Sequence, residues 1–245
     1  MMGVFPFPAA PRRIMLLNSK GGCGKSMIAT NLAGYYAARG RQTVLIDHDP
    51  QEASMQWLKV RPGERPPVHG ITASQNQGHV TRAFQMRIPS GTQRIIIDTA
   101  AGVRGHELTD LVREADIILI PVLPSHTDIY AVSRFIAQLL LEARVRSTRA
   151  RLGLVANRVR HNTRILDALK RFLTRLQLPV VTELRDSQNY IHAFGNGIAI
   201  HEVRPPSRVA KDVDQWTPLI EWLEASDEEL EEASSEAATG GGPLS

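Results

Sequence analysis

Short runs of apolar residues recur along the chain, and longer stretches with apolar residues at a helical period separate them. Such runs are typical of strands that are buried on both faces of a parallel sheet. The predicted strands begin with the apolar run from residue 14 onward and continue at residues 43–47, 68–72, 94–98, 117–122, 152–156 and 179–184. We expect the runs at 94–98 and 117–122 to be neighbouring strands at the centre of the sheet.

The stretches between these runs predict helices, because their apolar residues are spaced three or four positions apart. The predicted helices lie at residues 25–39, 50–57, 80–87, 105–114, 128–144, 162–176, 187–194 and 208–225. Gly40 is well placed to end the first helix, and Thr127 or Asp128 to cap the helix at 128–144. This alternation predicts an α/β fold, a doubly wound and mostly parallel sheet between two layers of helices.

The composition limits the class of protein. The 245 residues are enough for a single α/β domain, which we expect over residues 1–225. Cys23 is the only cysteine, which excludes disulfides and multi-cysteine metal clusters within one chain. No stretch approaches the roughly 20 apolar residues of a membrane span. Residues 1–13 lack the apolar run of a secretory signal, so we expect a cytoplasmic protein.

The formal charge of +4 hides an uneven distribution. Residues 224–245 carry seven acidic residues and no Lys or Arg, and we expect a disordered acidic tail at 226–245. Residues 1–223 hold the 29 basic side chains against 18 acidic ones, a net charge of +11. A body this basic is typical of proteins that meet a polyanion, either nucleic acid or an anionic membrane surface.

The loop after the first strand carries the first candidate chemistry. It contains three glycines, Gly21, Gly22 and Gly24. Glycines allow successive backbone N–H groups to turn inward around a phosphate. Lys25 offers a charge for the β and γ phosphates, Ser26 offers a hydroxyl for Mg²⁺, and the helix that follows presents its positive end. The strict phosphate-loop pattern would require glycine in place of Ser19, and Lys20 is an additional lysine.

Acidic residues stand at the ends of two predicted strands. Asp47 and Asp49 follow the second strand, and Asp98 ends the run at 94–98. The carboxyl ends of parallel strands meet at one edge of a sheet, where phosphates bind. A single carboxylate at such a place is commonly a helix cap, but three beside a lysine-bearing loop favour an ATPase with Mg²⁺.

Four blocks of residues support a family resemblance. They are Lys-Gly-Gly-Cys-Gly-Lys-Ser at 20–26, Asp-His-Asp-Pro-Gln at 47–51, Ile-Ile-Ile-Asp-Thr-Ala-Ala-Gly at 95–102, and Pro-Val-Leu-Pro-Ser at 121–125 with Asp128 following. These blocks resemble the ParA/MinD family of deviant Walker-A ATPases, over nearly the whole predicted body. The first two blocks together are highly specific, whereas the third alone would be weak. The resemblance implies the three-layer fold of a P-loop NTPase.

The resemblance implies roles for three catalytic residues. Lys20 is similar to the signature lysine that reaches across a homodimer to the nucleotide of the partner chain. Lys25 is similar to the lysine that holds the phosphates in its own chain, and Asp49 to the carboxylate that positions the attacking water. Phosphoryl transfer needs mainly alignment and charge neutralisation, which these residue types supply. Hydrolysis should therefore depend on dimerisation.

The resemblance also implies a nucleotide site and a metal site. Ser26 is similar to the Mg²⁺ ligand, and Asp47 and Asp98 to carboxylates that hold Mg²⁺ through water. The implied nucleotide-binding residues are Gly21, Gly22, Cys23, Gly24, Lys25, Ser26, Met27, Gly102, Asn157, Arg158, Pro205 and Pro206. The Asn157 amide offers the adenine edge a donor and an acceptor, although a turn residue at the end of a strand is the alternative. Met27 replaces a threonine found in many members, which removes one contact to the α-phosphate.

A basic stretch at residues 144–175 holds ten Arg or Lys against one acid. Charge runs are commonly only solvated faces, but a net +9 favours phosphate contacts that carry no sequence information. Arg208, after Ser207, matches the arginine of the family that contacts DNA. The predicted DNA-binding residues are Arg185, Arg208, Arg160, Arg164, Lys170 and Arg171.

The resemblance implies an ATPase that dimerises on ATP, binds nucleoid DNA nonspecifically and positions a cargo. A ParB-like or adaptor protein is expected to release it by stimulating hydrolysis. The cargo, a plasmid, chromosome, chemoreceptor cluster or microcompartment such as a carboxysome, stays open. We expect no N-terminal helix-turn-helix domain, because the chain starts close to its first strand. The alternatives are a membrane-cycling MinD-type protein, which the acidic C-terminus disfavours, and a metabolic synthetase or ligase, which would have no evident use for Lys20.

Overall fold

The computed structural model describes residues 10–73, 88–141, 143, 145, 148–160, 163–176 and 178–226. A seven-stranded sheet lies at its centre, in the order β3-β2-β4-β1-β5-β6-β7, and every pairing is parallel. The strands are β1 (Arg12–Leu16), β2 (Thr43–Asp47), β3 (His69–Thr72), β4 (Arg94–Asp98), β5 (Ile117–Val122), β6 (Arg151–Val159) and β7 (Val180–Arg185). The predicted strands and the predicted parallel sheet are thus confirmed.

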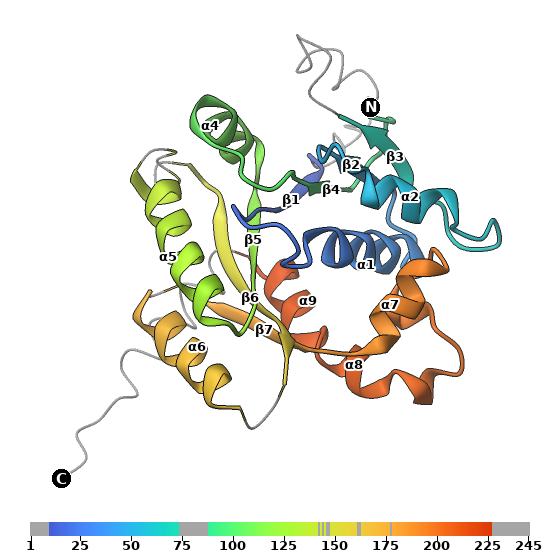
Figure 1. The fold of residues 1–245 in the computed structure, drawn as a ribbon. Helices are drawn as coiled ribbons and strands as arrows, with labels where there is room; N and C mark the ends of the chain where they lie inside the picture. Colours follow the sequence, from blue (N-terminus) through green and yellow to red (C-terminus); the bar gives the residue numbers. More distant parts are fainter. Residues whose placement is uncertain are drawn as a thin grey trace.

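Helices cover both faces of the sheet (Figure 1). They are α1 (Lys25–Ala38), α2 (Ala53–Lys59), α4 (Gly105–Glu114), α5 (His126–Leu141), α6 (Arg164–Arg175), α7 (Gln188–Gly195), α8 (Ala210–Asp214) and α9 (Thr217–Glu224), with the 3-10 turns η2 (Ile200–Glu202) and η3 (Pro206–Arg208). Because side chains alternate along a strand, Ile14 and Leu16 of β1 pack in the core with α1, α2, α7 and α9. Met15 packs in the opposite core, with α4, α5 and α6. The predicted three layers follow from this alternation.

Strand β1 lies between β4 and β5, so the prediction that β4 and β5 are neighbours is wrong. In the observed register Ile14 of β1 is opposite Ile96 of β4 on one side and Ile117 of β5 on the other. Apolar residues on both faces identify a strand as central, and all three strands meet that description. The neighbour of a parallel strand is decided by where its helical crossover returns the chain, which an apolar run does not encode.

Two element boundaries near the site differ from the predicted ones. Helix α5 begins at His126, and its cap is Ser125, whose Oγ accepts a hydrogen bond from the backbone N–H of Asp128 at 3.1 Å. Thr127 and Asp128 therefore lie inside the first turn rather than at the cap. Strand β6 continues to Val159, so Asn157 lies within the strand instead of following it.

The segment predicted as one closing helix at 208–225 forms two short helices, α8 and α9. Gln215 and Trp216 separate them. Pro218 lies in the first turn of α9, where its missing N–H leaves no helical bond unmade. Pro218 is therefore tolerated at the start of α9, whereas inside one continuous helix it would break the hydrogen-bond pattern. The helix predicted at 80–87 and the tail from residue 227 lie outside the described residues.

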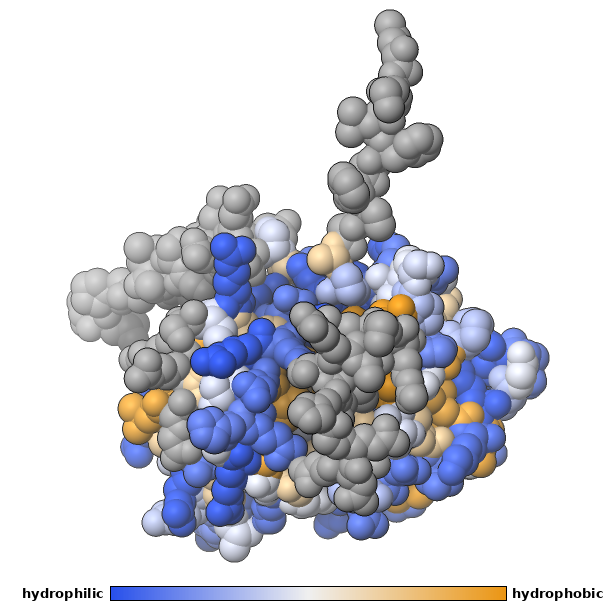
Figure 2. All heavy atoms as spheres, turned by 90° about the horizontal axis from the view of Figure 1, so that it is seen from above, coloured by the Kyte–Doolittle hydropathy of each residue, from blue (hydrophilic) through white to orange (hydrophobic). Residues whose placement is uncertain are grey.

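Hydrophilic residues prevail on the face seen from above in Figure 1, and apolar residues appear there in small separate areas (Figure 2). Within the described ranges no helix is both long enough and apolar enough to cross a membrane.

Candidate functional site

The loop between β1 and α1 forms the centre of the candidate site. Gly22 and Gly24 have φ values of 73° and 100°, in the left-handed region that side chains disfavour. A Cβ atom on Gly24 would lie 2.1 Å from Nδ2 of Asn157, so glycine is required there for space as well as conformation. Cys23 is fully buried and its Sγ donates to the carbonyl of Lys20 at 3.3 Å. The loop is therefore held in a fixed curve, as a phosphate cradle needs.

Lys25 begins α1 and is only 6% exposed. Its Nζ lies 3.5 Å from the carbonyl oxygen of Lys20, and the described residues supply no carboxylate partner. Asp98 is near enough for the Lys25 charge to lower its pKa, but a buried ammonium without an ion pair still favours an anion in the adjoining space. The N-terminus of α1 points its free N–H groups at the same place, which adds to that preference.

Asp47 and Asp98 are paired residues of β2 and β4, and both are fully buried. Oδ2 of Asp98 accepts a hydrogen bond from Ser54 Oγ at 2.7 Å, while Oδ1 has no partner within the described residues. Burial raises the pKa of Asp98 to about 6, although the nearby hydroxyls of Ser26 and Ser54 lower it. An unpartnered buried carboxylate oxygen beside a second carboxylate fits Mg²⁺, which is commonly bound by one or two carboxylates plus substrate phosphates.

Asp49 is oriented by its neighbours and lines the candidate site. Its backbone N–H donates to Oδ1 of Asp47 at 2.9 Å, and its own Oδ1 accepts from the N–H of Gln51 at 2.9 Å. Oδ2 of Asp47 accepts from the N–H of Ser54, so one carboxylate fixes the turn that presents the other. Burial raises the pKa of Asp47, against the lowering effect of these backbone hydrogen bonds.

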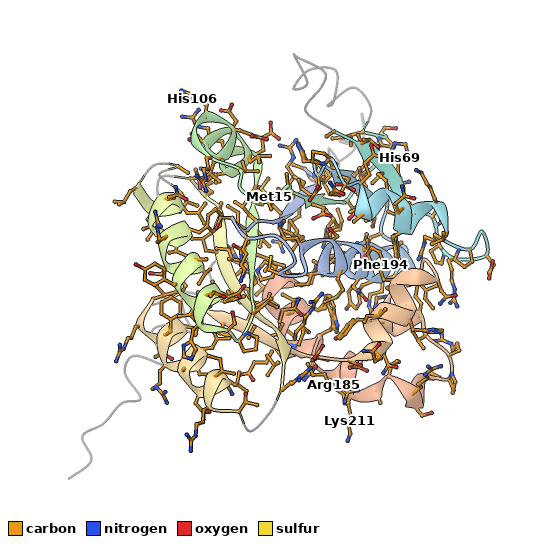
Figure 3. All side chains as sticks on the ribbon, in the orientation of Figure 1. Met15, His69, His106, Arg185, Phe194 and Lys211 are labelled. Carbon is orange, nitrogen blue, oxygen red and sulfur yellow. The ribbon has the colours of Figure 1, made fainter. Side chains whose placement is uncertain are left out.

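A cavity of about 590 Å³ opens in front of the loop, a volume in the range of ligand sites. Its lining includes the loop residues Gly21, Gly22, Gly24, Lys25, Ser26 and Met27, together with Asp49, Asn157 and Arg158. The opposite wall comes from the end of β7 and from α7, and it consists of Arg185, Asp186, Ser187, Tyr190, Ile191, Phe194 and Gly195. Figure 3 shows Phe194 on α7 beside α1, and Arg185 where β7 ends. Residues far apart in the sequence thus converge on one cavity.

Asn157 and Arg158 both line this cavity, and part of the Asn157 amide is already hydrogen-bonded within the chain. Nδ2 of Asn157 donates to the carbonyl of Cys23 at 2.8 Å, and the buried Oδ1 has no partner among the described residues. The Oδ1 acceptor is therefore left for a ligand. Arg158 adopts φ 52° and is exposed. Pro205 and Pro206 are exposed and do not belong to the cavity lining, so the structure does not bring them to the site.

The model of the CobQ/CobB/MinD/ParA nucleotide binding domain matches residues 14–200, more than half of the chain. The chain belongs to this family. Maintenance of carboxysome distribution protein A of Halothiobacillus neapolitanus is 28% identical over 200 residues, which cover 81% of this chain and 91% of that protein.

Two solved structures share the fold of this CobQ/CobB/MinD/ParA family member. A Cyanothece McdA variant in complex with ATP superposes with a TM-score of 0.65 at 16% identity, over 85% of this chain and 96% of that chain. MinD of Pyrococcus horikoshii in complex with Mg-ADP gives 0.66 at 15% identity, over 87% and 96%. At these identities the two structures show a common fold.

Lys20, the additional lysine of the loop, is bound by side chains of its own chain in this family member. Nζ of Lys20 lies 2.5 Å from Oδ2 of Asp128 and 3.3 Å from Oγ1 of Thr127, both in the first turn of α5. The Lys20 side chain is 37% exposed and that of Asp128 is 5% exposed. Ser125 also donates to the Asp128 carboxylate. The ammonium is thus held at the surface above the loop, with only part of its area open to a partner.

The predicted DNA-binding residues divide into two sets. Three are ion-paired: Arg160 with Asp186, Lys170 with Glu183 and Arg185 with Asp212, at 2.7, 2.8 and 2.6 Å. Arg164, Arg171 and Arg208 are exposed and have no ion pair within the described residues. Arg144 and Arg146 of the basic stretch lie outside those residues. Half of the predicted positions therefore carry a charge that a neighbouring carboxylate already compensates.

Sequence reasoning missed several site residues. The α7 wall of Tyr190, Ile191 and Phe194 was predicted only as part of a helix, although its position after the last strand could have placed it at the carboxyl edge. Ser54, which hydrogen-bonds Asp98, carries no motif and is brought there by α2. Gly102 has φ 76°, and a Cβ there would lie 3.9 Å from the Ser19 carbonyl, which places it against the loop rather than in the cavity lining.

Proposed function

We propose that the protein is an ATPase that dimerises on ATP, binds DNA without sequence preference in that state, and positions an intracellular cargo. The observation that carries the proposal is the pair of lysines in the loop. Lys25 is buried at the phosphate cradle, whereas Lys20 stands partly exposed at its rim, where a second chain could receive it. A single-chain nucleotide enzyme has no evident need for the second lysine.

The residues around the cavity fit ATP with Mg²⁺. The loop N–H groups and Lys25 would hold the phosphates, Ser26, Asp47 and Asp98 would hold Mg²⁺, and Asn157 and Arg158 would border the base. Mg²⁺, when bound, neutralises charge on the phosphate oxygens and orients them for attack. The unpartnered oxygens of Asp98 and Asn157 are the buried atoms that such a ligand would satisfy.

The proposed hydrolysis uses the chain's own residues to align water and to compensate charge. Asp49, held by the Asp47 carboxylate and directed into the cavity lining, would accept a hydrogen bond from the attacking water. Lys25 would stabilise the charge on the transferred phosphoryl group, and Lys20 of the partner subunit would complete that compensation from across the dimer. Turnover would therefore be slow in the monomer.

The basic body supports the DNA part of the proposal. Residues 1–223 carry a net charge of +11, and Arg164, Arg171 and Arg208 are exposed without an ion pair in the described ranges. Two chains together would double the number of phosphate contacts, so binding would depend on the dimer. We place the protein on the nucleoid in the cytoplasm.

The cargo and the partner are proposed from the relatives. A curated relative is a maintenance of carboxysome distribution protein, so a microcompartment of that kind is the first cargo to examine. A ParB-like or adaptor protein that carries the cargo would stimulate hydrolysis and release the ATPase from DNA.

Co-sedimentation with random-sequence DNA and with anionic liposomes, each with ATP, ADP or no nucleotide, tests the proposal. We expect the protein to be retained on DNA with ATP, and not with ADP or without nucleotide. Retention on liposomes instead would favour a membrane-cycling protein of the MinD type, and retention on neither would reject both. Lys20→Ala serves as the matched variant: it should keep ATP binding and lose both the ATP-dependent dimer in light scattering and retention on DNA.

A further inference from the structure

The carboxylate of Asp212 in α8 is completely buried and surrounded by donors. Oδ1 accepts from Arg185 Nε at 2.6 Å, and Oδ2 accepts from Arg185 Nη2 at 3.1 Å and from Asn189 Nδ2 at 2.7 Å. Ser187 Oγ donates to the same Oδ2 at 3.4 Å. Burial raises the pKa of Asp212, but the hydrogen bonds from Arg185 and Asn189 outweigh it and hold that pKa below its ordinary value. The group is therefore a buried anion whose donors come from Arg185, Ser187 and Asn189.

These donors belong to the wall of the nucleotide cavity. Arg185 and Ser187 line the cavity directly, and Asn189 lies in the first turn of α7, which supplies the rest of that wall. Trp216 makes a second link, because its Nε1 donates to the hydroxyl of the cavity residue Tyr190 at 3.0 Å. The wall that faces the ligand is thus held from behind by the segment at residues 212–216.

The same segment continues directly into exposed basic residues. Arg204, Arg208 and Lys211 are exposed, and we call the stretch at 204–211 the basic segment. Asn189 Nδ2, which is bound to Asp212, also donates to the carbonyl of Arg208 at 3.3 Å. Lys211 points away from the body in Figure 3. One buried carboxylate therefore connects the cavity wall to a surface that carries positive charge.

We propose that Asp212 is a positioning residue that couples occupancy of the nucleotide cavity to the placement of the basic segment. A nucleotide that contacts the α7 wall shifts Arg185 and Asn189, and their hydrogen bonds to Asp212 transmit the shift to α8 and Arg208. Arg185 then acts at the cavity rather than on DNA, because its guanidinium is already bound to a carboxylate. The inference rests on the proposed nucleotide site, but it does not require that the basic segment binds DNA.

Asp212→Asn tests the coupling, because the amide keeps the shape of the side chain while the anion is lost. The matched control is Asp214→Asn, an exposed aspartate of the same helix that has no ion pair in the described residues. Backbone hydrogen exchange is measured with and without ATP in the loop at 18–26 and in the segment at 204–216. In wild type and in the control, ATP should slow exchange in both regions.

In Asp212→Asn the loop should still be protected by ATP, whereas the response of residues 204–216 should be lost. If DNA binding is nucleotide-dependent, the factor by which ATP raises the affinity for DNA should also be about tenfold smaller in the variant. A factor of this size is usual for coupling between two sites. A normal response at 204–216 in this variant would overturn the inference.

If the wild type shows the response but no DNA binding, the proposed DNA function fails and the coupling stands. If ATP protects neither region in wild type, the nucleotide site and the coupling fail together.

Arg185→Gln provides an independent test if Asp212→Asn does not fold. Replacing Arg185 removes a guanidinium whose side chain is 34% exposed and leaves the buried Asp212 carboxylate with the Asn189 and Ser187 donors. It breaks the same link from the cavity wall. It should reproduce the loss of response at 204–216. A retained response in folded Arg185→Gln would contradict the proposed route.

Discussion

At the scale of single residues, the contact between Lys20 and Asp128 opposes the role that family resemblance gives to Lys20. A lysine that serves a second chain must leave the carboxylate that holds it in the first. The ion pair is partly exposed, so its contribution is modest, about 1 kcal/mol or less. In the proposed dimer the pair would therefore be a weak restraint on dimer formation.

Replacing Asp128 with asparagine should release Lys20 and favour the ATP-dependent dimer by about two- to fivefold, as expected for loss of a partly exposed ion pair. Sedimentation at several protein concentrations with ATP measures the dimer constant. The double variant Lys20→Ala with Asp128→Asn should not dimerise. A weaker dimer in Asp128→Asn alone would show that Asp128 instead positions Lys20 for its partner.

His201 provides a test of stability against pH. Its ring packs edge-on against Tyr35, with centroids 5.1 Å apart, and burial lowers its pKa from 6.5 to about 4 despite the opposite effect of Glu202. The folded protein thus binds this proton less readily than the unfolded chain. The contribution of His201 to the free energy of unfolding should be fully present above pH 6.5. It should be lost as the pH drops toward 4, by up to about 3 kcal/mol.

His201→Gln should reduce that fall, because the titrating group is removed. Urea unfolding of the wild type and the variant across this pH range measures how steeply the free energy of unfolding changes with pH. Equal slopes in the two proteins would show that carboxylates alone cause the loss of stability in acid.

At the scale of elements, the sequence predicted where strands and helices lie far better than how they end. β2, β4, β5 and α4 have the predicted bounds, because apolar runs and helical periods are local signals. The cap of α5 was misplaced because Ser125, Thr127 and Asp128 are all good capping residues, and only the backbone geometry selects one. The extension of β6 to Val159 depends on its pairing with β7, a contact between segments far apart in the chain.

The buried ion pair of Arg61 and Glu202 fixes the end of α2 against η2. Their side chains are 5% and 4% exposed, and Arg61 donates two hydrogen bonds of 2.9 Å to the carboxylate. Glu202→Gln should lower the free energy of unfolding by about 3–5 kcal/mol, because it leaves a buried charge uncompensated. Denaturant titration measures the change, with the exposed Glu221→Gln as the control. A loss no greater than that of the control would show that Arg61 can reach water.

At the scale of the whole molecule, the site could be predicted only in part. The phosphate loop and the three aspartates follow from residue types at fixed spacing, and the structure brings them to one edge of the sheet. The α7 wall, the pairing of Arg185 with Asp212 and the strand order could not be predicted, because each depends on segments that meet only in the folded chain. Pro205 and Pro206 were assigned to the base from family resemblance, and the structure leaves them outside the cavity.

The separation of paired from unpaired arginines predicts unequal effects on DNA binding. Arg208→Glu should weaken binding to random-sequence DNA and reduce the salt dependence by about one phosphate contact per chain, with ATP binding unchanged. Arg160→Glu is the matched comparison, since Asp186 already compensates Arg160, and its effect should be smaller. Fluorescence anisotropy at several salt concentrations measures both. Equal losses would show that the Arg160 ion pair opens on DNA.

The buried thiol of Cys23 has a practical consequence for following the molecule in cells or on DNA. The sequence contains no other cysteine, and burial raises the pKa of this thiol, so little reactive thiolate is available while the loop is folded. A Glu64→Cys variant would therefore carry one reactive surface thiol. A maleimide dye could be attached there without altering the loop, and labelling of the unmodified protein would report that the loop had opened.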